Sequence, residues 1–202
     1  MNLKDIDHDA LTELFNIGLH RAAASLSELT GQRIVVDLPR LWVCPIEETY
    51  ARLVDFLDGD LATVHQIFKG TVTGDAVLVL DYDSATRLSA LMTGGGVAVG
   101  GRLDQSAREV LAEVGNVILS SCLSSFGDML HVSVSFSVPR MHVESLEGLL
   151  GSIQVDSEEM NFALLAATRF RLTEGEVGGY LMIAVGISSL DLINKALAEH
   201  DP

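Results

Sequence analysis

The sequence has few of the residues that mark several common kinds of site. Its two cysteines, Cys44 and Cys122, lie in apolar surroundings without Cys-x-x-Cys spacing, so we interpret them as reduced core thiols, neither disulfide nor metal site. Its longest apolar runs, such as 76–80 and 181–185, fall far short of the roughly 20 residues that cross a bilayer. The N-terminus does not resemble a basic and then apolar leader. We therefore expect a cytoplasmic protein.

Positive charge is also scarce. There are three lysines, Lys4, Lys69 and Lys195, and the formal net charge is −15. Nucleic acids and anionic membranes are bound by dense basic surfaces, so we expect neither as a partner. The six histidines lack the spacing of metal ligands, and His20, one turn after Asn16, is either part of a docking surface or a bystander. No Ser-His-Asp, Cys-His or Gly-x-Ser-x-Gly arrangement indicates a conventional hydrolase.

The sequence does contain an internal repeat. Three kinds of residue recur at an offset of one hundred: Glu13 and Glu113, Asn16 and Asn116, and Pro39 and Pro139. Asparagine occurs only five times and proline four times in the 202 residues. Their shared offset therefore indicates two copies of one structural unit.

Each copy shows the same predicted order of elements. We expect a long amphipathic helix, a strand ending at the proline, a short helix, two strands joined by a turn, and a closing helix. In the first copy these are at 9–30, 33–38, 46–57, 62–72, 76–80 and 85–92. In the second they are at 104–126, 130–138, 143–150, 161–172, 180–185 and 190–197. Gly31 and Gly127 should end the long helices, and Asp83 and Ser188 should cap the closing ones.

The two copies are predicted to share one core. The glycine-rich stretch 94–101 follows a helix and has no Gly-Lys-Ser/Thr ending, so we interpret it as a connector and not a phosphate-binding loop. We expect a single α+β domain spanning 1–202, with repeats at about 1–93 and 104–202. One central, mostly antiparallel sheet would be crossed by the two long helices about a pseudo-twofold axis. A chain that carries both repeats is expected to be a monomer.

A polar stripe follows each long helix. Asp9, Glu13 and Asn16 stand at i, i+4 and i+7, which places them on one helix face, and Glu109, Glu113 and Asn116 repeat the pattern. One such stripe alone is ordinary solvated surface. However, asparagine is a poor helix former, and the nearby Gly18 and Gly115 each cost about 1 kcal/mol relative to alanine. This cost at two matched places favours a functional site.

These residues resemble a known family. The pattern Asp-x3-Glu-x2-Asn-x22-Pro, here Asp9, Glu13, Asn16 and Pro39, is similar to the signature of the CheC, CheX and FliY phosphatases. The second copy reads Glu109, Glu113, Asn116 and Pro139, and departs from the family only at Glu109, where the pattern has Asp or Ser. Two Glu-x-x-Asn motifs make CheC the best match. The resemblance covers essentially the whole chain.

The resemblance implies a fold and a reaction. The substrate would be a CheY-like response regulator whose own active site holds a phospho-aspartate, Mg²⁺ and a lysine. Asn16 and Asn116 would orient the attacking water, and Glu13 and Glu113 would pair with the regulator's lysine. The Mg²⁺ belongs to the regulator, so we expect no cofactor and no metal site in this chain.

Two alternatives stay open. The chain could be an adaptor that binds the regulator or the deamidase CheD, although two intact Glu-x-x-Asn pairs favour catalysis. It could also be a flagellar-switch protein of the FliM type, which shares the fold. We expect such a protein to carry an N-terminal peptide and a C-terminal domain that this chain does not show.

Overall fold

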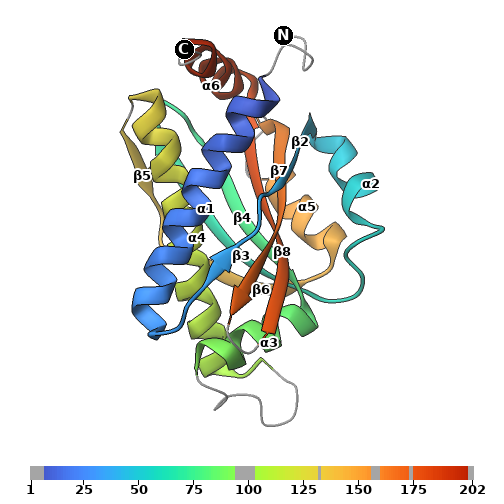
Figure 1. The fold of residues 1–202 in the computed structure, drawn as a ribbon. Helices are drawn as coiled ribbons and strands as arrows, with labels where there is room; N and C mark the ends of the chain where they lie inside the picture. Colours follow the sequence, from blue (N-terminus) through green and yellow to red (C-terminus); the bar gives the residue numbers. More distant parts are fainter. Residues whose placement is uncertain (1–6, 94–102, 132, 156–159, 173–174, 200–202) are drawn as a thin grey trace.

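The computed structural model describes residues 7–93, 103–131, 133–155, 160–172 and 175–199 (Figure 1). The first copy contains α1 (His8–Thr30), β1 (Val35–Val36), β2 (Arg40–Pro45), η2 (Ile46–Glu48), α2 (Thr49–Leu53), β3 (Leu61–Gly70), β4 (Gly74–Asp81) and α3 (Tyr82–Met92). The second contains α4 (Gln105–Leu130), β5 (Val134–Phe136), β6 (Arg140–Glu144), α5 (Leu146–Val155), β7 (Met160–Leu172), β8 (Gly175–Gly186) and α6 (Ile187–Glu199).

The strands form one antiparallel sheet in which the two copies interlock. The strand order is β1-β7-β8-β4-β3-β5, with β2 also pairing with β7 and β6 also pairing with β3. The first copy therefore supplies the edge strands β1 and β2 that pair with β7 of the second copy. The second copy supplies the edge strands β5 and β6 that pair with β3 of the first. If each strand is replaced by its counterpart in the other copy, the same order is obtained when the sheet is read from its opposite edge. The predicted α+β fold with a pseudo-twofold sheet is confirmed.

Helices cover both faces of the sheet. Apolar side chains alternate along the central strand β4, as expected for a strand that is buried on both sides. Ala76 and Leu78 pack in the larger core under α1, α3, α4 and α6. Val77 and Val79 pack in a smaller core with residues of α2 and α5. The chain thus has three layers, and the long helices α1 and α4 lie together on one face (Figure 1).

The two long helices pack closely and antiparallel. Phe15 meets Phe126 edge to face, with ring centroids 5.2 Å apart, and Gly18 faces Cys122. A methyl group added at Gly18 would lie 2.7 Å from the Cα of Cys122. The glycine on α1 therefore sets the distance between the helices. Among the described residues, α4 is the one helix long and apolar enough to span a membrane, but 56% of that segment is buried inside the protein.

Helix ends differ in part from the prediction. Gly31 ends α1 with φ 66°, as expected. Gly127 does not end α4, because the helix continues to Leu130 and His131 takes the left-handed position with φ 51°. The expected caps Asp83 and Ser188 lie inside α3 and α6. Asp81 caps α3 instead by accepting from the backbone N–H of Ser84 at 2.7 Å. The predicted connector 94–101 lies outside the described residues.

The strands before the two prolines are shorter than predicted, and the strands after them were missed. Proline has no N–H to donate, so each edge strand breaks there and resumes as β2 or β6. Val36 and Arg40 are four positions apart in the chain, while their partners Phe170 and Ala167 on β7 are three positions apart. The extra residue forms a bulge at the sheet edge. The helix predicted at 46–57 begins at Ile46 as expected but ends at Leu53, and β6 occupies the start of the helix predicted at 143–150, so that α5 begins only at Leu146.

A small polar network interrupts the apolar face of the sheet on the α5 side. His65 lies between the carboxylates of Asp75, at 3.6 Å, and Glu144, at 3.2 Å, and its ring meets His142 edge to face. Thr63 donates to Glu144 at 2.6 Å. Burial acts to lower the pKa of His65, but hydrogen bonds and charges from Asp75 and Glu144 outweigh it and raise the pKa above 6.5. The fold therefore favours the protonated form of His65 more than water does.

The contact at Gly18 gives a stability prediction. We expect Gly18→Ala to lower the free energy of unfolding by about 1–3 kcal/mol, because the added methyl overpacks the interface with α4. Urea unfolding measures this difference. Gly151→Ala in α5 is the matched control, since no atom lies within 4 Å of the added methyl, and it should leave stability unchanged or raise it. A Gly18→Ala variant as stable as the parent would contradict the close packing.

The His65 network gives a pH prediction. Because the folded-state pKa lies above the unfolded value of 6.5, the protonated ring stabilises the fold fully below about pH 6.5. This contribution is lost as pH rises through the folded pKa. The stability advantage of the parent over His65→Gln should therefore shrink between pH 6 and pH 9 in urea titrations. An advantage that grows over this range would show the opposite sign of coupling.

Candidate functional site

The two polar stripes are exposed along α1 and α4. Glu13 and Glu113 are exposed, while Asn16 and Asn116 are half-buried. The flanking Asp9 and Glu109 are also exposed, Pro39 is buried, and Pro139 is half-buried. Each pair lies in the first half of its helix, so antiparallel packing places the pairs toward opposite ends of the helix pair. Carboxylate and carboxamide are brought together in each copy, as the helical spacing predicts.

In the first copy the two side chains of the pair are hydrogen-bonded to each other. The Nδ2 of Asn16 donates to Oε2 of Glu13 at 3.3 Å. The Oδ1 of Asn16 is buried and has no hydrogen-bond partner. His20 contacts the backbone carbonyl of Asn16 through Nδ1 at 2.9 Å. His20 thus contacts the backbone of Asn16 and not its side chain.

In the second copy a residue of the first copy joins the pair. The Nε2 of Gln66, on β3, donates to Oδ1 of Asn116 at 3.0 Å and to the carbonyl of Ser137 at 3.1 Å. The carboxylate of Glu113 has no partner among the described residues. Ser120 donates to the backbone carbonyl of Asn116 at 2.5 Å, as the counterpart of His20. Gln66 was not predicted, because nothing in the sequence around it sets it apart.

The proline loops lie at the sheet edges and carry exposed apolar side chains. Leu38 and Val138, each directly before the motif proline, are 67% and 82% exposed. The residue before each is tied to the sheet: Asp37 N–H donates to the carbonyl of Arg169 at 3.0 Å, and Ser137 N–H to that of Ile67 at 2.8 Å. The loops thus present one apolar residue each to solvent. The repeat offset would have identified them from the sequence.

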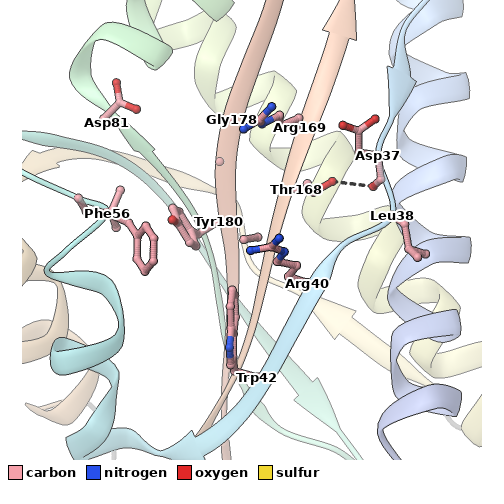
Figure 2. Close-up of a pocket in the computed structure, with 13 residues that line it drawn as sticks. Asp37, Leu38, Arg40, Trp42, Phe56, Asp81, Thr168, Arg169, Gly178 and Tyr180 are labelled. Atoms are coloured by element: carbon pink, nitrogen blue, oxygen red, sulfur yellow. Dashed lines mark hydrogen bonds between the residues drawn. The ribbon is translucent and has the colours of Figure 1, made fainter.

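A cavity of about 570 Å³ opens beside the first of these loops (Figure 2). Arg40, Trp42, Phe56 and Tyr180 line it, and Figure 2 shows the Thr168 side chain bonded to Asp37 at its rim, where the hydroxyl donates to the carbonyl at 2.8 Å. Neither glutamate nor asparagine of the two motifs lines this cavity.

The described residues offer no competing chemistry of metal or thiol type. No group of three or more His, Cys, Asp or Glu side chains among them is placed to hold a metal ion. Both cysteines are buried and unpaired. Burial raises the pKa of Cys122 to about 12 and also raises that of Cys44, so neither thiol is an activated nucleophile.

No family model matches the chain. Among curated proteins, the flagellar motor switch phosphatase FliY of Bacillus subtilis is 23% identical over 177 residues, which cover 87% of this chain and 45% of that protein. The chain thus spans about half the length of FliY. The CheY-P phosphatase CheC of the same species is 26% identical over 164 residues, which cover 76% of each protein.

Solved structures show the same fold. FliY of Thermotoga maritima matches with a TM-score of 0.77 at 18% identity, over 98% of each chain. The FliM middle domain of Vibrio alginolyticus matches with a TM-score of 0.63 at 13% identity, over 93% of this chain and 99% of that one. A chain of the CheX–CheY complex with BeF3 and Mg²⁺ from Borrelia burgdorferi matches with a TM-score of 0.52 at 14% identity, over 85% and 97%.

These relatives agree with the resemblance indicated by the two Glu-x-x-Asn motifs and by the prolines at fixed spacing. The chain is therefore similar in sequence to the CheC and FliY phosphatases and shares the fold of FliY.

Proposed function

We propose that this protein is a phosphatase that removes the phosphoryl group from an aspartyl-phosphorylated, CheY-like response regulator in chemotaxis signalling. The observation that carries the proposal is the repeated pair itself. Glu13 and Glu113 are exposed, and each has an asparagine one turn further along its helix. Curated relatives named as CheY-P phosphatases, and a CheX–CheY complex with the same fold, support the choice of substrate.

The asparagine would act on the attacking water. A carboxamide cannot take up a proton near neutral pH, so Asn16 and Asn116 would orient the water by hydrogen bonds without acting as bases. Holding a reactant in line is a large part of phosphoryl-transfer catalysis, because the transferring group needs little covalent assistance. The regulator would supply the Mg²⁺ that stabilises the developing charge, and this chain would hold the attacking water in position.

The glutamate and the proline loop would fix the docking position. An exposed carboxylate such as Glu113 suits a charge-assisted hydrogen bond to the regulator's lysine. Val138 lies on the loop whose Ser137 is linked through Gln66 to Asn116, so an incoming protein that reaches the asparagine also meets this side chain. We propose that the regulator covers Val138 at one site and Leu38 at the other.

The remaining properties follow the same proposal. The protein would work in the cytoplasm as a monomer without a cofactor of its own, and CheD would be a further partner. The likeness to the FliM middle domain favours a second candidate, a structural or adaptor role in which the regulator binds without losing its phosphoryl group. Only an assay of phosphoryl loss separates the two.

The asparagines give the main functional test. With regulator phosphorylated by acetyl phosphate and Mg²⁺, we expect this protein to accelerate loss of the aspartyl phosphate. Asn16→Ala combined with Asn116→Ala should return the rate to the regulator's own decay, because no amide is left to orient water. Each single variant should retain part of the activity. Asn194→Ala, on α6, is the control and should match the parent.

Two outcomes would contradict this proposal. A double variant as fast as the parent would show that the asparagines do not orient the water. A parent that binds the phosphorylated regulator without changing its decay would favour the adaptor.

Val138 gives a separate test of docking. Because it is 82% exposed, Val138→Ser should change the free energy of unfolding by less than about 0.5 kcal/mol. In an Asn16→Ala background, which leaves only the second site, it should raise KM for the phosphorylated regulator several-fold with little change in kcat. An unchanged KM would show that the regulator does not cover this loop.

A further inference from the structure

The two sites are built from the same parts except at one position of the sheet. Arg140 pairs with His65 on β3, and its counterpart Arg40 pairs with Ala167 on β7. Gln66 and Thr168, the next residues on those strands, are therefore equivalent. Both donate to the carbonyl of the loop residue two before the motif proline, Gln66 at 3.1 Å and Thr168 at 2.8 Å. Figure 2 shows the bond of Thr168. Only Gln66 also reaches the motif asparagine.

The helices differ in how closely they approach the sheet. The residue before Asn116 is Gly115, where an added methyl would lie 2.6 Å from Cγ1 of Val64 on β3. At the same place in the first copy stands Phe15, which is fully buried. The glycine lets α4 settle onto the strand that carries Gln66. The ring of Phe15 packs against Phe126 of α4.

Gln66 lowers stability at its position more than anchoring the loop would require. It is 2% exposed, its Nε2 makes both hydrogen bonds, and its Oε1 is buried without a partner. A buried acceptor left unsatisfied costs stability. Thr168 anchors the equivalent loop with a hydroxyl alone. The longer amide therefore adds one thing, which is the bond to Asn116.

We propose that Gln66 is a positioning residue for Asn116 and makes the two sites unequal. Its amide holds Oδ1 of Asn116 inward, so the Nδ2 donor faces outward and Glu113 is free to pair with an incoming cation. In the first site, Nδ2 of Asn16 is engaged by Glu13 and must be released before either group can act. The second site is thus prepared before docking. This inference rests on the proposed phosphatase function.

The test uses single-site backgrounds and the equivalent residue as control. In Asn16→Ala protein, Gln66→Thr keeps a hydroxyl for the Ser137 carbonyl but cannot reach Asn116, which recreates the arrangement of the first site. We expect kcat to fall roughly five- to tenfold, the effect of losing about one positioning hydrogen bond, with KM unchanged. Thr168→Val in the same background removes the matching loop bond at the other site and should leave both constants as they were.

A second readout does not depend on activity. The side-chain amide signals of Asn116 in nitrogen-15 NMR spectra should shift and narrow toward solvent-exposed values in Gln66→Thr, and stay in place in Thr168→Val. Unchanged Asn116 signals in Gln66→Thr would overturn the proposal, because the bond would then not hold the amide.

The kinetic outcomes separate this inference from the proposed function. If Asn116→Ala abolishes turnover in the Asn16→Ala background while Gln66→Thr leaves kcat unchanged, positioning by Gln66 is overturned and the phosphatase stands. If Asn116→Ala also leaves the decay unchanged, the phosphatase proposal fails, and the role of Gln66 in it fails as well. Equal falls in kcat for Gln66→Thr and Thr168→Val would point to general loosening of the loops and overturn the specific role.

Discussion

The exchange of edge strands between the two copies is the constraint on which the candidate sites depend. β1 and β2 pair with β7 of the other copy, and β5 and β6 pair with β3. The motif asparagine of the second copy is therefore held by a strand of the first. Each site combines a helix and a loop from one repeat with a strand from the other. Hydrogen bonds of the sheet, which fix register, thereby fix the sites as well.

The motif proline has a physical place in this arrangement. It interrupts an edge strand where the loss of an N–H is tolerated, and the bulge there turns a backbone carbonyl inward. That carbonyl accepts from Thr168 in one copy and from Gln66 in the other. Asparagine and proline lie 23 residues apart in sequence, yet in the second copy a single amide joins their surroundings. The spacing of the motif thus reflects the length of helix and strand needed to bring them together.

Much of this could be predicted from the repeat, and part could not. Helical spacing alone places Glu13 beside Asn16, because i and i+3 positions share a face. The strands after the prolines were missed since proline usually marks an end, whereas here it marks a bulge in a continuing edge. Gln66 could not be found because its role depends on strand register between copies. The same holds for Gly115, whose fit against Val64 depends on how closely α4 lies to β3.

The interlocked sheet has a consequence for how such a chain can arise and be divided. Cut between the repeats, either piece would keep its long helix and its hairpin but would lack the strands that complete its outer edge. Two copies of one piece could supply those strands to each other, since the strand order is the same from both sides. A symmetric dimer of single repeats and a fused tandem are thus two forms of one architecture, and only the fused form lets the two halves diverge in sequence.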